Sequence, residues 1–118
     1  MVRWLDRQPR LSVWPTSITI LEIRFGIAIL PVGRRQRLLS DAFEKALAEK
    51  LDRRVAVFGA DSAHEASALM AIHQRKGRVV ELRDAMIAGI ALAHRATLAT
   101  RNTRHFDDLP TPVVNPWQ

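Results

Sequence analysis

Hydrophobic and polar positions along the chain form helical stripes separated by short β-prone runs. The clearest stripe lies at 34–51, where apolar residues recur at the i, i+3, i+4 spacing of one helix face. A second segment, 81–95, is apolar on nearly every side, which predicts a buried helix. A third helix is expected at 20–30, because Pro31 and Gly33 follow it.

A fourth helix is expected to begin at a cap formed by Asp61 or Ser62 and to run to about Lys76, where Gly77 is a good C-terminal stop. Between the helices, β-prone runs occur in this order: 11–18, 55–58, 97–100 and 113–114. This alternation predicts an α/β fold, a three-layer α/β/α domain with a short parallel sheet. With no linker or internal repeat visible, residues 1–118 are expected to form one domain.

Composition narrows the functional classes. At 47% hydrophobic and 25% charged residues, the chain has the balance of a globular protein. It contains no cysteine, which excludes disulfides, thiolate zinc sites and a cysteine nucleophile. Glycine-rich phosphate loops and the G-x-S-x-G motif are absent. No signal peptide is visible, and Glu22 and Arg24 interrupt the most apolar stretch, so we expect a cytoplasmic protein that does not cross a membrane.

The net charge of +6 comes from 15 Arg and 3 Lys against 12 acidic residues. A basic surface favours polyanions such as nucleic acid. The preference for arginine over lysine also fits a bias in genome base composition, in which case the charge only solvates the surface. Both interpretations stay open from the sequence.

Two acidic residues stand at helix starts. Glu22 completes the pattern Thr19-x-x-Glu22, which fits a capping box, and it also sits where a strand meets a helix, the place where ligands collect in α/β sheets. Asp84 lies in the first turn of the apolar helix at 81–95, where the helix dipole favours an acid. Small neighbours on its face leave space beside the carboxylate, which needs a partner if it is buried.

The segment 100–108 follows a predicted strand directly and is polar. Its hydrogen-bonding or metal-competent residues are Asn102, His105, Asp107 and Asp108, and its arginines, Arg101 and Arg104, can meet phosphate. A solvated surface loop explains the same residues. Converging carboxylates without a nucleophile suit a hard cation, Mg²⁺ or Mn²⁺, which can orient water and stabilise charge on a scissile phosphate.

Four motifs, in order, resemble those of PIN-domain ribonucleases, in particular VapC toxins of the FitB-like subgroup. They are the helix from Thr16 through Glu22 to Gly26, the segment Asp84-Ala-Met-Ile-Ala88, the loop Leu98-Ala-Thr-Arg-Asn102-Thr-Arg-His-Phe106, and the ending Val113-Val-Asn-Pro-Trp117. The likeness covers essentially the whole chain.

The resemblance implies a metal-dependent ribonuclease toxin of a type II toxin–antitoxin pair. Glu22 and Asp84 then correspond to metal ligands, Asn102 is a third catalytic residue, and Arg101 and Arg104 bind RNA. The implied cofactor is Mg²⁺ or Mn²⁺. The implied partners are an RNA substrate, a VapB-like antitoxin and a second copy of the chain.

The chain also departs from the family pattern. Met1 aligns with the family's first helix, so the preceding strand and its catalytic Asp are expected to be missing, and His105 stands where the family often has an acid. Two alternatives follow. One is a truncated remnant that only dimerises or binds an antitoxin, and the other is a basic nucleic-acid-binding module whose acids are helix caps.

Overall fold

The computed structural model describes residues 7–8, 13–100, 103–106, 109 and 111–115. By its internal contacts the chain divides into an N-terminal unit, 2–56, and a C-terminal unit that comprises 57–118 and Met1. The expectation that residues 1–118 form one domain stays a prediction. No helix in the described part of the chain is both long and apolar enough to cross a membrane.

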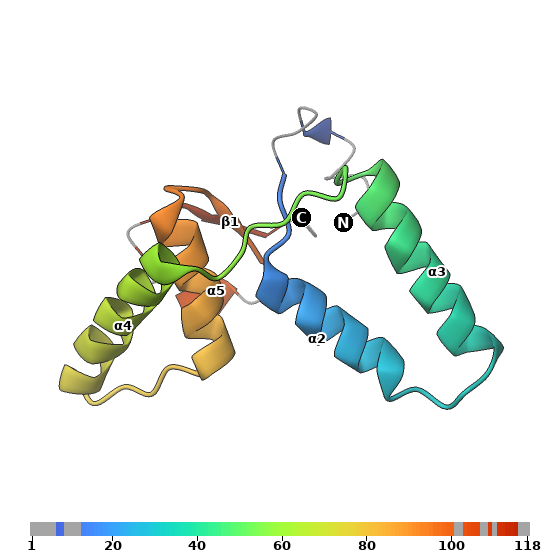
Figure 1. Cartoon of the computed structure of the whole chain (residues 1–118). Coiled ribbons are helices and arrows are strands. Elements are labelled where there is room, and N and C mark those ends of the chain that lie inside the picture. Colours follow the sequence, from blue (N-terminus) through green and yellow to red (C-terminus); the bar gives the residue numbers. More distant parts are fainter. Residues whose placement is uncertain (1–6, 9–12, 101–102, 107–108, 110, 116–118) are drawn as a thin grey trace. The chain divides into compact units, whose positions relative to one another are not determined.

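The N-terminal unit contains two helices, α2 (Ser17–Ala28) and α3 (Arg34–Glu49), joined by a short loop (Figure 1). They pair through Arg24, whose guanidinium lies 2.6 Å from the Glu44 carboxylate and 5.1 Å from the centre of the Phe43 ring. Gln36 donates a hydrogen bond to the carbonyl oxygen of Ile27 near the end of α2. The helices expected at 20–30 and 34–51 are therefore confirmed, with different ends.

The start of α2 differs from the sequence prediction. Thr16 is the N-cap, and its side-chain oxygen accepts a hydrogen bond from the Thr19 backbone N–H at 2.9 Å. Thr16 takes this role because its extended backbone forms an isolated parallel bridge with Ala56, so the helix begins at the next residue. The capping box at Thr19 is wrong, since Glu22 lies inside the helix. Of the β-runs predicted at 11–18 and 55–58, the described residues form only this bridge.

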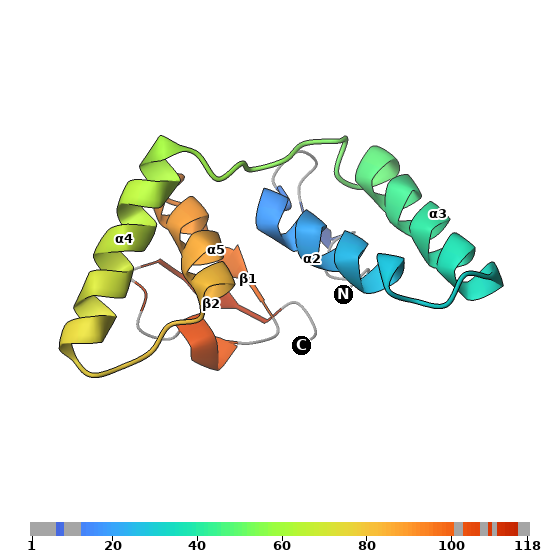
Figure 2. The ribbon, with the colours of Figure 1, turned by 60° about the horizontal axis from the view of Figure 1, so that its bottom comes forward.

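The C-terminal unit consists of two packed helices, α4 (Ala60–Arg75) and α5 (Leu82–Ala93), a short 3₁₀ helix η1 (Thr103–Phe106) and two strands (Figure 2). The strands, β1 (Leu98–Ala99) and β2 (Val113–Val114), are parallel, with Leu98 opposite Val113. The expected α/β fold with a short parallel sheet is confirmed.

The ends of α4 confirm one prediction and correct another. Gly59, not Asp61 or Ser62, is the N-cap, because the helix begins earlier and the Ser62 side chain is buried against the Val57 carbonyl. Gly77 does end the helix, with φ at +73°, a backbone conformation that glycine adopts at little cost.

The core of the C-terminal unit lies where α4 and α5 meet the sheet and η1. Its buried side chains are Leu69, Ala88, Ala91, Leu98 and Phe106. The helix expected at 81–95 is buried as predicted, and small residues on it allow the close approach of α4. A Cβ atom added to Gly89 comes within 2.8 Å of the Ala66 Cβ and even closer to the Ser62 backbone oxygen.

We expect Gly89→Ala to destabilise the chain by about 1–3 kcal/mol, because the added methyl group meets backbone that cannot move cheaply. Gly26→Ala on α2 is the matched control. Nothing lies within 4 Å of a Cβ at Gly26, so the change should stabilise the helix by roughly 0.5–1 kcal/mol. Thermal unfolding followed by circular dichroism measures both. Equal shifts in the two melting temperatures contradict the close packing of α4 and α5.

Candidate active site

Asp84 occupies the first turn of α5, three residues after the N-cap. The cap is Glu81, whose carboxylate accepts a hydrogen bond from the Asp84 backbone N–H at 3.1 Å. The Arg83 side chain also contacts Glu81, at 3.2 Å. Glu81 thus caps the N-terminal end of α5, and the Asp84 carboxylate can contact other elements.

Desolvation of the Glu81 carboxylate acts to raise its pKa. This effect is outweighed by hydrogen bonds from the Asp84 N–H and from Arg83 and by the positive charge of Arg83. The pKa of Glu81 therefore lies below its usual value. A carboxylate with a lowered folded-state pKa stabilises the fold above its unfolded pKa and loses that contribution as the pH falls through the folded one. The cap that positions Asp84 is therefore present at neutral pH and lost only in acid.

His105 of η1 is the partner of Asp84. Its Nδ1 lies 2.9 Å from Asp84 Oδ2, although the residues are 21 positions apart in the sequence. An ionised carboxylate only accepts hydrogen bonds, so Nδ1 is the donor when Asp84 is charged. The Asp84 side chain is 24% exposed and that of His105 54%, so solvent reaches both. The contact joins the start of α5 to the segment that follows β1.

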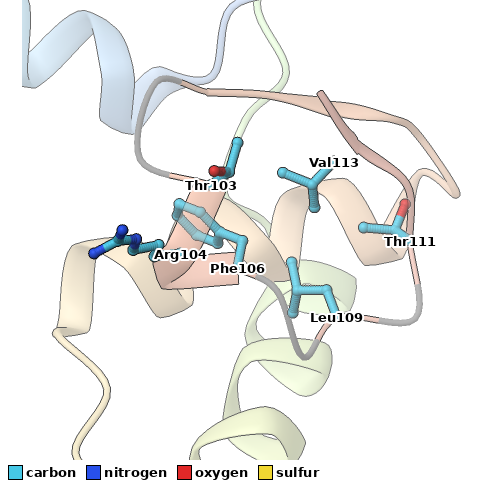
Figure 3. A pocket seen from close by; sticks show the side chains of 6 residues that line it. All are labelled: Thr103, Arg104, Phe106, Leu109, Thr111 and Val113. Carbon is cyan, nitrogen blue, oxygen red and sulfur yellow. The ribbon is translucent and has the colours of Figure 1, made fainter. Parts of the chain in front are cut away.

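The C-terminal unit contains two open pockets to which η1 contributes residues. The first, about 410 Å³, lies between η1 and β2 (Figure 3). Phe106, Leu109 and Val113 point toward one another in it, whereas the Arg104 side chain points away from these three. The second, about 480 Å³, contains Asp84 and His105 in its lining. The second pocket therefore brings the acid Asp84 together with the loop residues Arg104 and His105.

Among the other candidate residues, the structure describes Glu22. Glu22 lies on α2 of the N-terminal unit, and capping does not account for it. Asn102 and Arg101, and the acids Asp107 and Asp108, lie outside the described residues.

A divalent cation in proteins is usually held by several oxygen or nitrogen ligands. None of the residues that the structure describes form a group of three or more His, Asp or Glu side chains placed to hold a metal ion. Asp84 still provides a solvent-accessible carboxylate, the kind of ligand that a hard cation prefers. Its contact with His105 is made by Oδ2. His105 adds an imidazole that keeps this carboxylate in position. The donor set fits one carboxylate ligand with a histidine beside it, and further oxygen ligands must come from other residues or water.

We expect His105→Ala to lower the affinity for Mn²⁺ about tenfold, the usual effect of losing a partner that orients a ligand. Because the pair is exposed, the change in stability should stay below about 1 kcal/mol. His105→Asn is the matched variant, since its amide keeps a donor near the position of Nδ1. Titration calorimetry with Mn²⁺ separates the two. A positioning role is contradicted if alanine and asparagine have the same effect.

Comparison with known proteins identifies related chains. The PIN-domain family profile matches residues 1–111. The chain is 39% identical to the plasmid stability protein StbB of Pseudomonas syringae over 98% of its length and 83% of the relative. It is 32% identical to the VapC ribonuclease Y4jK of Sinorhizobium fredii over 100% of its length and 84% of the relative.

The fold of the chain is also similar to that of solved structures. The complex FitAcB from Neisseria gonorrhoeae contains a chain that superposes with a TM-score of 0.87 and 29% identity, covering 99% of this chain and 84% of that one. A structure of FitAB bound to a DNA fragment matches with the same score and identity over 99% and 82%.

Proposed function

Because this chain belongs to the PIN-domain family, we propose that it is the toxin of a type II toxin–antitoxin pair, a nuclease that hydrolyses RNA phosphodiester bonds with a divalent cation. Its relatives support the proposal. One of them is named a VapC ribonuclease, and another, which is 29% identical, is named the toxin FitB. The proposed location is the cytoplasm.

The observation that carries the proposal is the contact between Asp84 and His105. An acid in the first turn of a helix ordinarily serves the helix itself, yet here Glu81 is the cap and the Asp84 carboxylate meets the segment after β1. This position, at the edge of an open pocket with arginines in its lining, favours the nuclease over a module whose acids are only caps. The arginines attract the polyanion, and Asp84 supplies the negative charge that a cation needs.

In the proposed mechanism Asp84 is a ligand of Mg²⁺ or Mn²⁺. The resemblance to PIN-domain ribonucleases gives Glu22 the same role and Asn102 a supporting catalytic role. The cation supplies charge stabilisation at the scissile phosphate and makes water a better nucleophile. His105 keeps the Asp84 carboxylate in position. Arg101 and Arg104 bind the RNA backbone. A VapB-like antitoxin holds the toxin inactive, and a second copy of the chain forms a homodimer.

Cleavage of an end-labelled RNA by the purified chain tests this function. The proposal predicts products with Mg²⁺ or Mn²⁺, none with EDTA, and recovery when the metal is returned. Cleavage that persists in EDTA contradicts the metal mechanism. Tight binding of the antitoxin without cleavage of any RNA supports instead the alternative of a remnant that only binds.

A further inference from the structure

The larger pocket of the C-terminal unit, about 480 Å³, extends well beyond the Asp84–His105 pair. Four segments contribute to it: the end of α4, the link to α5, the start of α5 and η1. Its lining residues are His73, Arg78, Val79, Val80, Glu81, Asp84, Arg104 and His105. The pocket therefore continues from the proposed cation ligand onto a surface to which we have assigned no role.

Arg78 has a fixed backbone on this surface. Its N–H donates to the His73 carbonyl at 2.9 Å, and the Gly77 N–H donates to the Gln74 carbonyl at 3.0 Å. This pair of hydrogen bonds is the Schellman motif that ends α4, made possible by the positive φ of Gly77. The link that starts at Arg78 therefore leaves the helix in a defined direction.

The charged residues of the pocket lining are two acids, Glu81 and Asp84, and two arginines, Arg78 and Arg104. Glu81 contacts Arg83 and the Asp84 N–H, and Asp84 contacts His105 while it keeps the negative charge that the proposed cation needs. Arg78 lies in the link before α5 and Arg104 lies on η1, and each carries a permanent positive charge that can bind a phosphate. Between them an apolar surface is accessible, since Val79 is 97% exposed and Val80 half-buried.

We propose that this pocket binds one nucleotide of the RNA strand, the one adjacent to the scissile phosphate. Arg78 and Arg104 bind its phosphate, and Val79 and Val80 pack against its ribose or base. The proposal rests on the function proposed above and specifies how that site holds its substrate. A nucleotide whose base packs against Val79 and Val80 must be unstacked, so the pocket takes a single strand, because bases in a duplex are not splayed out.

Salt dependence of RNA binding tests the proposal without cleavage. The full chain is titrated into a fluorescently labelled single-stranded RNA in EDTA, and anisotropy is measured over a range of salt concentrations. Each phosphate contact to single-stranded nucleic acid adds about 0.7 to the slope of log K against log[salt]. Arg78→Ala and Arg104→Ala should each lower the slope by about 0.7, and the double variant by about 1.4.

Arg75→Ala and Lys76→Ala are the matched controls. Both residues are exposed at the same end of α4, both changes remove one positive charge, and neither residue lines the pocket. They should leave the slope nearly unchanged. Val79→Ser should weaken binding at every salt concentration and keep the slope of the unmodified chain.

The outcomes separate the two proposals. If the unmodified chain does not bind RNA, the proposed function itself is overturned. If it binds RNA, but Arg78→Ala and Arg75→Ala change the slope equally, RNA remains the ligand and the nucleotide pocket is wrong. A duplex RNA bound as tightly as a single strand also contradicts the pocket.

Discussion

Asp84→Asn is expected to reduce RNA cleavage at least 100-fold, roughly the loss that follows removal of a group that stabilises charge in a transition state. Asparagine has the shape of aspartate and can still accept a hydrogen bond from His105, so only the negative charge is lost. That charge is what attracts the cation. The measurement is the initial rate on a labelled RNA with saturating Mn²⁺.

Asp61→Asn is the control for this variant. Asp61 is also an acid in the first turn of a helix, α4, and is exposed there. Either substitution should cost about 0.3–1 kcal/mol of favourable interaction with the helix dipole. Only Asp84→Asn should abolish cleavage. If the two variants lose activity to the same extent, Asp84 acts through helix stability and not at the site.

Phe106→Ala is expected to destabilise the chain by about 3–5 kcal/mol, the usual cost of removing a buried aromatic ring. Phe106 is 4% exposed and packs in the core with Leu98 and Ala88. It is also the last residue of η1, which carries Arg104 and His105. The variant should therefore lose RNA binding together with stability, and urea unfolding measures the loss.

The matched control is Phe25→Ala on α2. The Phe25 side chain is 59% exposed, and exposed substitutions usually change stability by about 0.5 kcal/mol or less. A similar loss in both phenylalanine variants contradicts the position of the core. Loss of RNA binding by Phe106→Ala at a temperature where its folded signal is intact assigns η1 to the RNA site.

The hydrophobic pattern predicted α3 and α5, and the stop signals at Pro31, Gly33 and Gly77 helped to predict α2 and α4, because all of these signals are local. The C-terminal end of α4 followed from Gly77, which has the positive φ that a helix stop favours. The N-terminal ends were wrong at α2 and α4, because capping depends on contacts beyond the local sequence. Thr16 is the cap of α2 because its extended backbone pairs with Ala56, forty residues along the chain.

The candidate site was predictable only where the signal was local. Asp84 was recognised from its place in an apolar helix, and the structure brings it to the segment after β1. The role of His105 was not predicted, because nothing local indicates a contact between residues 21 positions apart. Arg78 was missed as well. The sequence signal that could have indicated Arg78 is Gly77, because the glycine that ends α4 fixes the direction in which the chain continues at the next residue.

The central claim is that Asp84 binds a divalent cation, and the most direct test requires no knowledge of the RNA target. Mn²⁺ is titrated into the unmodified chain and into Asp84→Asn, and the electron paramagnetic resonance signal of free Mn²⁺ reports binding. We predict binding by the unmodified chain and an affinity at least 10-fold lower in the variant. Equal affinity in the two proteins contradicts the account.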